Sequence, residues 1–385
     1  MVRILSRLCR KGQFSHAAAD AWICGLHTLQ VNVLQRQKER NIRMKLKRTM
    51  AMLMAGVMCA GALAGCGSKS DSGSAASKSG LKDLTFVIAA RDEFMSSIEA
   101  AMKVEAEPLG YNIVTQDAQN DSAKQIQYIE TAVNGGADAV ICLPVDADGT
   151  QSLIDAAGEA KLVFVNRPPT NMDELAADNV GYVGSNEDTS GYFQGEYLAE
   201  YFKSQGKKEI KYLMIQGTLG QVSTTKRSAG VLKALEDNGI KAAEASAPVV
   251  ADYDRPTAQE MIQPLLTSGI EYDCIIANND AMALGAIEAC KDANVEINFP
   301  IVGIDCTKDG AQAITEGTLA MTVFQNPVGQ GKGSVIAAMN MIAGDPINKG
   351  MEDMGNMDDS GNEYSDHVFW VPFEPVTKDN VADYM

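Results

Sequence analysis

Residues 274–290, which read CIIANNDAMALGAIEAC, determine the predicted fold class. The first four are apolar enough for a buried β-strand, and Asn278, Asn279 and Asp280 then interrupt the apolar run. From Ala281 onward the residues are strong helix formers with apolar side chains at helical spacing. This order predicts a strand, a polar turn and a helix, which is half of a βαβ unit. We expect Asp280 to cap the helix, leaving Asn279 free at the carboxyl end of the strand, where open α/β sheets bind ligands.

The same pattern of strand, polar turn and helix recurs through most of the chain. Strands are predicted at residues 84–90, 111–116, 139–143, 162–165, 182–185, 210–215, 242–248, 301–304, 321–324 and 368–371. Strands that alternate with helices favour parallel sheets covered on both faces. There are too many strands for one small sheet, and the pattern restarts near Ser185 and turns again near Gln325. We therefore predict an α/β protein with two doubly wound parallel-sheet lobes.

The first 80 residues are predicted to be a leader and a tether. Residues 44–48 (MKLKR) are basic, residues 50–62 are apolar, and residues 63–65 (LAG) place small residues before Cys66. The apolar run is too short for a membrane span and is typical of a secretory signal. We treat residues 1–43, which precede a complete signal peptide, as the product of a start codon assigned too far upstream. Residues 66–80 are rich in Gly, Ser and Lys, which predicts a flexible tether.

The sequence LAGC resembles the bacterial lipobox, in which the cysteine is diacylated and becomes the mature N-terminus. That resemblance makes Cys66 the lipidation site and places the protein outside the cytoplasm, anchored to the outer face of the cell membrane. The alternative is an ordinary secretory signal followed by an incidental cysteine.

Charge and cysteine content exclude several classes of function. The formal charge is −17, and residues 1–65 carry 11 basic and 2 acidic residues, so the remainder carries −17 − 9 = −26. Such an acidic surface argues against nucleic-acid binding. Cys142, Cys274, Cys290 and Cys306 show no CxxC spacing, which argues against zinc. We interpret Cys142 and Cys274 as core residues, and a disulfide between Cys274 and Cys290 stays open as an alternative.

The predicted strand ends carry a mixture of carboxylates, amides, guanidinium groups and aromatic rings. The candidates are Asp92, Phe94, Asn166 and Arg167 in the first half, Gln221, Ser223, Arg227, Tyr253, Asn279 and Asp305 in the second half, and Gln325 at the crossing between them. This mixture suits a neutral polyol, because each hydroxyl both donates and accepts hydrogen bonds. Aromatic rings can lie against the C–H faces of a sugar. Each residue also has a purely structural interpretation, as a helix cap, a surface charge or a core side chain.

Enzyme interpretations find little support in the sequence. It contains no GxGxxG after a strand, no GxxxxGK[ST], no GxSxG and no HExxH. Beyond the leader there is one histidine, His367, which leaves little for imidazole-based catalysis. An exported glycosidase is the enzyme alternative, but no pair of carboxylates has a spacing that points to it. We predict no catalytic residues and no cofactor.

Several segments together resemble the type I periplasmic binding proteins of sugar ABC transporters, in the galactose/glucose- and ribose-binding branch. The segments are residues 92–96 (DEFMS), 116–121 (QDAQND), 182–184 (YVG), 276–283 (IANNDAMA), 303–305 (GID), 371–373 (VPF) and 378–380 (KDN). The resemblance covers about residues 82–385. It implies two lobes joined by a three-crossing hinge that closes on a sugar. The expected lobes are residues 81–185 with 325–366, and residues 186–324 with 367–385.

The same resemblance implies roles for the candidate residues. By matching position, Asp92, Asn166, Arg167, Arg227, Asn279, Asp305 and Gln325 would hydrogen-bond the sugar and Phe94 would stack on one face. Tyr253, in residues 251–255 (ADYDR), resembles the aromatic residue that closes the other face in the ribose branch. The partners implied are a monosaccharide and an ABC permease, for a monomeric binding protein.

Two departures from the galactose/glucose pattern narrow these expectations. That branch has a histidine and an aspartate where this chain has Gln221 and Ser223, which argues against galactose or glucose as the ligand. Residues 203–209 (KSQGKKE) lack the oxygen ligands of that branch's calcium loop, so we predict no metal. A sensory subunit that presents the sugar to a chemoreceptor or sensor kinase is the main functional alternative. A sugar-responsive repressor is disfavoured by the signal peptide.

Overall fold

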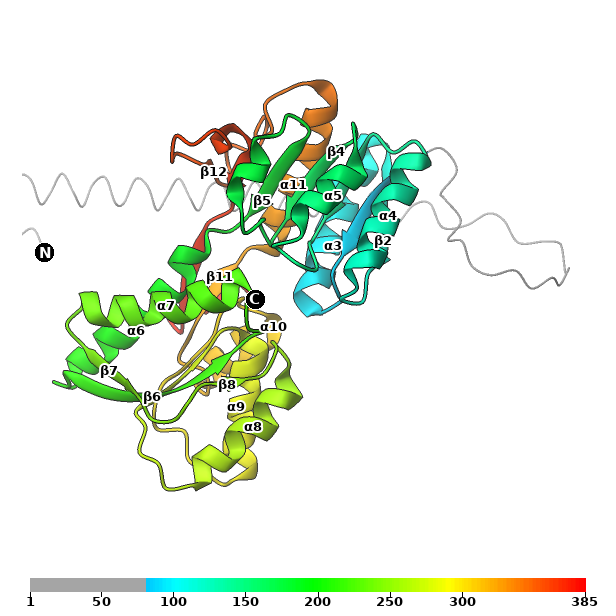
Figure 1. The fold of residues 1–385 in the computed structure, drawn as a ribbon. Helices are drawn as coiled ribbons and strands as arrows, with labels where there is room; N and C mark the ends of the chain where they lie inside the picture. The colour runs from blue at the N-terminus through cyan, green and yellow to red at the C-terminus, as the bar shows by residue number, and fades with distance from the viewer. Residues whose placement is uncertain (1–80) are drawn as a thin grey trace, which may run out of the picture. The chain divides into compact units, whose positions relative to one another are not determined.

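The computed structural model describes residues 81–385 of the chain. Within these residues the chain forms two lobes, each built on a seven-stranded, mostly parallel sheet with helices on both faces (Figure 1). The predicted α/β fold class with two parallel-sheet lobes is confirmed. The predicted signal peptide, tether and lipidation site at Cys66 lie outside the described residues.

The sheet of the first lobe has the strand order β12-β13-β5-β4-β3-β1-β2. All neighbouring pairs are parallel except β12 with β13. Its strands are β1 (Lys82–Ile88), β2 (Tyr111–Asp117), β3 (Ala139–Cys142), β4 (Lys161–Val165), β5 (Val180–Gly184), β12 (Asn356–Met357) and β13 (Val368–Trp370). Because the pairs are parallel, the strands β1 and β4 both end at the same edge of the sheet.

Alternate residues of these strands face two separate layers of helices, as the pleat of a strand requires. Phe86 and Ile88 pack with α3 (Glu93–Ala106) and α11 (Pro327–Ala343). Val87 packs on the other face with α4 (Ser122–Asn134) and α5 (Thr150–Ala157). Short 3-10 helices at Glu107–Leu109, Met172–Ala176 and Ser365–His367 complete this lobe.

The sheet of the second lobe has the order β14-β11-β10-β9-β6-β7, and β8 also pairs with β6. Only the edge strand β14 is antiparallel to its neighbour. Its strands are β6 (Glu209–Gln216), β7 (Lys241–Glu244), β8 (Val249–Val250), β9 (Cys274–Ala277), β10 (Ile301–Val302), β11 (Met321–Gln325) and β14 (Phe373–Thr377). The strand predicted at the start of residues 274–290 is therefore confirmed as β9, inside a parallel sheet.

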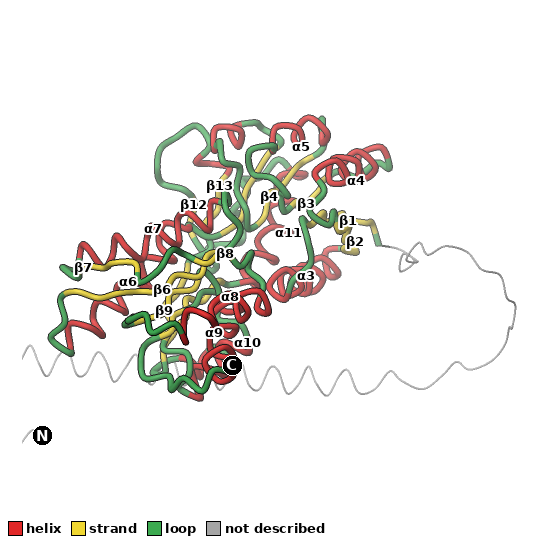
Figure 2. Tube along the Cα trace, turned by 60° about the horizontal axis from the view of Figure 1, so that its bottom comes forward, coloured by secondary structure: helices red, strands yellow, loops and turns green. Residues whose placement is uncertain are grey.

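Five helices cover the second sheet in the described part of the chain. Leu198 and Val231 lie in the layer formed by α6 (Glu187–Ser204) and α7 (Val222–Asp237). Ile262, Ile287 and Ile314 lie in the opposite layer, formed by α8 (Arg255–Thr267), α9 (Asp280–Asp292) and α10 (Lys308–Glu316). Figure 2 shows these two groups of helices on either side of β6 and β9. The last 3-10 helix is Val381–Asp383.

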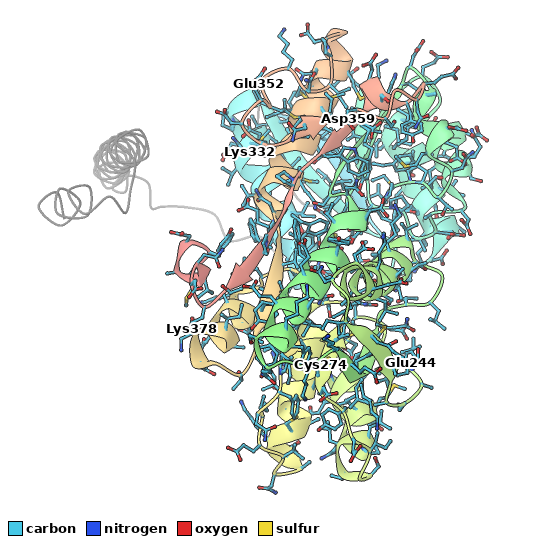
Figure 3. The ribbon with its side chains drawn as sticks, turned by 90° about the vertical axis from the view of Figure 1, so that its left-hand side faces the viewer. Glu244, Cys274, Lys332, Glu352, Asp359 and Lys378 are labelled. Carbon is cyan, nitrogen blue, oxygen red and sulfur yellow. The ribbon has the colours of Figure 1, made fainter. Side chains whose placement is uncertain are left out.

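The chain passes between the lobes at places that differ slightly from the expected boundaries. Gln325 ends β11 in the second sheet, where it pairs with Phe373, and α11 follows in the first lobe. The expected boundary at residue 367 is wrong, because β13 pairs with β5 and belongs to the first sheet. Figure 3 accordingly shows Asp359 in the first lobe and Lys378 in the second. A short apolar strand does not reveal from its sequence which sheet it joins.

The four cysteines of the described region are buried and free. Cys142 and Cys274 lie in strands, so their interpretation as core residues is confirmed. A disulfide between Cys274 and Cys290 is not formed, because the two side chains pack into the helix layers on opposite faces of the second sheet. No helix within residues 81–385 has the length and apolar character needed to cross a membrane.

Candidate functional site

A cavity between the two lobes brings together all eleven residues proposed from the sequence. It encloses about 240 Å³ and is lined by Asp92, Phe94, Asn166, Arg167, Gln221, Ser223, Arg227, Tyr253, Asn279, Asp305 and Gln325. These residues lie at or just beyond the carboxyl ends of strands or on the helices that follow. The cavity therefore occupies the ligand-binding edge of both parallel sheets.

Asp92 both caps a helix and lines the cavity. Its Oδ1 accepts a hydrogen bond of 2.7 Å from the backbone N–H of Met95, so α3 begins at Glu93. Burial raises the pKa of the Asp92 carboxyl, although hydrogen bonds from the backbone of Met95 and Phe94 and the charge of Arg167 oppose the shift. The structural and the ligand-facing interpretations of Asp92 are thus compatible.

Asn166 and Arg167 are held by the backbone around them. Arg167 donates from Nη1 to the carbonyl oxygens of Pro144 and Val145, at 2.6 and 2.8 Å. Asn166 has a φ of +65°, in the left-handed region, and donates from Nδ2 to Gln330 Oε1 at 3.1 Å. Gln330 in turn donates to Ser185 Oγ at 3.0 Å, beside the first crossing between lobes. Asn166 is therefore linked through Gln330 to the segment that joins the lobes.

Arg227 is engaged by a carboxylate that the sequence reasoning did not find. Glu187 accepts from its Nε at 2.8 Å and from its Nη2 at 2.7 Å, and both side chains are buried. Arg227 Nη1 donates to the carbonyl oxygen of Asn278 at 2.8 Å. Burial lowers the pKa of Arg227, but the charge and hydrogen bonds of Glu187 outweigh it and raise the pKa above its ordinary value. Its guanidinium group is therefore largely satisfied before any ligand binds.

Nothing in the local sequence identifies Glu187 as the partner of Arg227. It stands in the first turn of α6, where an acidic residue is favourable at any exposed helix start. Only the packing of α6 against α7 brings it to Arg227, which lies 40 positions later in the chain.

Asp305 is the most distinctive group in the cavity. Its side chain is 9% exposed, and its nearest cation is Arg227 Nη1 at 3.9 Å. Within residues 81–385 no side chain or backbone group donates a hydrogen bond to its carboxylate. Burial and the negative charges of Asp280, Asp92 and Glu187 raise the pKa of Asp305 well above its ordinary value, against the charge of Arg227. A buried acceptor without a donor is costly unless a ligand or water satisfies it.

The polar turn after β9 differs from the expectation in one respect. Asn279, not Asp280, caps α9, because its Oδ1 accepts from the backbone N–H of Met282 at 3.0 Å. Asp280 is the first helical residue and is completely buried. The prediction that Asp280 is the cap is wrong, since the helix begins one residue earlier than the apolar periodicity suggested. Asn279 still lines the cavity while serving as the cap.

Two aromatic rings line the cavity, one from each lobe. Phe94 lies in the first turn of α3 and is half-buried. Tyr253 has a φ of +63°, and its hydroxyl lies 2.8 Å from Ser223 Oγ and 2.8 Å from Thr224 Oγ1. Its ring passes so close to Gly217 that a Cβ there would lie 2.0 Å from it. Ser223 therefore supports Tyr253 as well as lining the cavity.

Gln325 and Gln221 complete the second-lobe side. Gln325 is 2% exposed, and its Nε2 is buried without a hydrogen-bond partner in the described residues. Its Oε1 accepts from Arg227 Nη2 at 3.4 Å. Gln221 is the residue before α7. The orphaned amide of Gln325 is a donor available to a ligand.

Sequence reasoning missed several other lining residues besides Glu187. They are small or ordinary polar residues near the named ones, including Asn120, Pro168, Thr218, Asp252 and Thr307. Residue type is a usable sequence signal for Asn120 and Asp252, because Asn and Asp are favoured in tight turns. The structure places both in such turns, with φ values of +59° and +52°. Within residues 81–385 no group of three or more His, Cys, Asp or Glu side chains is arranged to hold a metal ion.

Comparison with known proteins identifies the class of this fold and cavity. Residues 85–346 match the model of the periplasmic binding protein domain family. The chain belongs to this family, whose named relatives here are sugar-binding proteins of ABC transporters and not enzymes.

Three relatives illustrate the range of the family. A Rhizobium meliloti protein, provisionally named for rhizopine binding, is 33% identical over 76% of this chain and 89% of its own length. The ribose import binding protein of Salmonella typhimurium is 30% identical over 66% of this chain and 82% of its own. The crystal structure of an ABC transporter solute-binding protein of Bacillus halodurans with bound myo-inositol is 30% identical. It covers 80% of this chain and 99% of its own, with a TM-score of 0.66.

Proposed function

We propose that the protein captures one small cyclic polyol, a monosaccharide or an inositol, between its lobes and delivers it to an ABC permease. The observation that carries this proposal is the pair of unsatisfied groups in the cavity. Among residues 81–385 the Asp305 carboxylate, which lines the cavity, has no hydrogen-bond donor, and the buried Nε2 of Gln325 has no acceptor. A ring hydroxyl is both donor and acceptor, so neighbouring hydroxyls can satisfy both groups.

The size and the aromatic lining support a ligand with a single ring. A cavity of about 240 Å³ is smaller than the roughly 300–1,000 Å³ of sites for drug-sized ligands. Phe94 and Tyr253 line the cavity from different lobes, and an aromatic ring can lie against the C–H groups of a sugar ring. The relatives named for ribose and rhizopine, and the one bound to myo-inositol, support the same class of ligand.

Binding between lobes implies that the connecting segments act as a hinge. The chain crosses after β5, after β11 and after β13. A ligand that contacts both lobes favours the closed state by its differential affinity for that state. Closure of this kind gives the permease a signal that distinguishes loaded from empty protein.

We also propose that the mature protein is held at the outer face of the cell membrane by lipid on Cys66. Support comes from the basic segment, the apolar segment and the sequence LAGC at residues 63–66. Metabolic labelling with a radioactive fatty acid should mark the wild-type protein and leave Cys66→Ala unlabelled. Label on both proteins would exclude Cys66 as the anchor.

The test of ligand class is a thermal-shift screen of the purified protein. The panel contains hexoses, pentoses, deoxysugars, aminosugars and inositols, together with acyclic polyols and amino acids as outgroups. We expect stabilisation by one or a few cyclic polyols, confirmed by calorimetry with one site per chain. Stabilisation by amino acids alone, or by none of the cyclic compounds, would refute the proposal.

A further inference from the structure

Asp280 is a buried carboxyl group that touches the binding site only through its neighbours. It does not line the cavity, whereas Asn279 and Ala281 on either side of it do. Its Oδ1 accepts from Thr322 Oγ1 at 2.6 Å, and its Oδ2 accepts from the backbone N–H of Thr307 at 2.8 Å. Asp280 thereby joins α9, the start of α10 and β11 at one point.

Two glycines make the space that this carboxyl group occupies. A Cβ at Gly303 would lie 2.3 Å from Asp280 Oδ1, and a Cβ at Gly310 would lie 2.1 Å from Oδ2. Neither position has an unusual φ that would itself require glycine. The two glycines, one after β10 and one in α10, therefore form a cradle whose role is to admit the carboxyl group.

The turn next to this cradle has an unfavourable backbone conformation. Asp305 and Cys306 have φ values of +118° and +52°, a region that residues with side chains rarely adopt. The backbone N–H of Asp305 donates to the carbonyl of Val323 at 2.7 Å, and that of Cys306 donates to Thr322 Oγ1 at 3.2 Å. Thr322 therefore contacts both this turn and Asp280. Asp280 also accepts a hydrogen bond from the backbone N–H of Thr307, the residue that ends the turn.

We propose that Asp280 is a positioning residue of the ligand site. Its carboxyl group, seated between Gly303 and Gly310, keeps residues 304–307 in the conformation that directs Asp305 into the cavity. This inference rests on the proposed function, in which Asp305 accepts a hydrogen bond from the bound polyol.

The titration of Asp280 should make ligand affinity depend on pH, which a purely structural contact would not do. Burial raises the pKa of Asp280 to about 7, against the hydrogen bonds from Thr322 and Thr307. The charged or titratable groups near it are Asp305 and Cys306 in the turn, Glu93 of the other lobe, and Lys308 and Asp309 in the first turn of α10. An ionised Asp280 repels an ionised Asp305, so a ligand that binds the ionised form of Asp305 favours the protonated form of Asp280.

The sign of the resulting pH dependence follows from this repulsion. Because ligand binding favours the protonated Asp280, the affinity of the wild-type protein should fall relative to that of Asp280→Asn as pH rises above about 7, whereas the titration of Asp305 itself affects both proteins. For one linked proton the fall is at most about tenfold per pH unit. In Asp280→Asn the neutral amide can still accept from Thr307 and donate to Thr322. We therefore expect it to bind with an affinity that does not fall between about pH 7 and pH 9.

Asp280→Ala removes both contacts and should weaken binding at least about tenfold at about pH 6.5, while Asp280→Asn stays within about threefold of wild type there. Thr322→Val should show a smaller loss in the same direction. The matched control is Asp273→Ala, at the other end of β9, whose carboxylate accepts from Lys211 N at 2.7 Å and pairs with Lys207 at 2.6 Å. This control should lower the melting temperature without changing affinity.

Calorimetry across this pH range with the polyol found in the screen tests the inference. Equal affinities for Asp280→Ala and the wild type, or equal losses in Asp280→Ala and Asp273→Ala, would overturn it. A wild-type protein that binds no cyclic polyol refutes the proposed function instead. The crystal structure of Asp280→Ala then tests the positioning role by itself. We expect the φ of Asp305 to leave the left-handed region in this variant. An unchanged turn contradicts the inference.

Discussion

The buried pair of Glu187 and Arg227 gives the strongest stability prediction. Glu187 accepts two hydrogen bonds from Arg227, and both side chains are less than one-tenth exposed. Replacing either residue with alanine leaves the other charge buried without its partner. Breaking a buried pair in this way costs about 3–5 kcal/mol. At roughly 2–4 °C per kcal/mol for a unit the size of one lobe, Arg227→Ala should lower the melting temperature by about 6–20 °C.

A neighbouring pair on the same two helices provides the control. Lys226 and Asp188 join α7 to α6 at 2.8 Å, but their side chains are 40% and 63% exposed. Exposed pairs contribute about 0–1 kcal/mol, so Lys226→Ala should change the free energy of unfolding by no more than that. The two substitutions differ by one position in sequence and mainly by burial.

The assay is urea unfolding followed by circular dichroism, applied to Glu187→Ala, Arg227→Ala and the double variant. Because the double variant leaves no unpaired charge, its loss should be smaller than the sum of the two single losses by about 2 kcal/mol or more. Single losses below about 1 kcal/mol, or losses that add, would show that the pair is not what holds α6 to α7 at the cavity. Arg227→Ala would also weaken ligand binding, but through this loss of structure.

Three further predictions concern the cavity and its titration. Asp305→Asn should weaken polyol binding by about 10- to 150-fold, because a hydrogen bond to a charged group contributes about 1.5–3 kcal/mol. Undiminished affinity by calorimetry would remove Asp305 from the site. Gly217→Ala should displace the Tyr253 ring, since the new Cβ would meet it at 2.0 Å; the expected result is weaker binding with a cooperative unfolding transition, and unchanged affinity contradicts a ring contact with ligand. The free energy of unfolding should fall as pH rises from about 4 to about 7, because the pKa of Asp280 is about 7 in the folded protein and 3.8 is its ordinary value, so the folded state binds the proton that the unfolded state releases. Asp280→Asn should reduce that slope, and an identical slope in both proteins would rule out this assignment.

The part of the site that could be read from the sequence is the set of residues that follow strands. Strand, turn and helix recur with enough regularity to locate the strand ends, and parallel strands bring their carboxyl ends to one edge of a sheet. All eleven candidates accordingly line one cavity. Their assignment as ligand contacts remains a prediction for the binding experiments.

The interactions among these residues could not be predicted from the sequence. Glu187 pairs with Arg227 only because α6 and α7 pack together, and Asp280 enters a cradle whose two glycines lie 23 and 30 positions further along the chain. The sequence also placed the cap of α9 one residue too late. Caps depend on the dihedral angles of single residues, which periodicity does not report.

The sequence by itself determined the fold class, the two lobes and the location of the polar groups, because these follow from local periodicity and from the direction of parallel strands. Only the tertiary structure decided which polar groups are already satisfied. Arg227 and Asn166 are held by neighbours from distant segments, while Asp305 and Gln325 retain unsatisfied capacity for a ligand. The physical reason is that hydrogen-bond satisfaction depends on distances of about 3 Å between segments far apart in the chain.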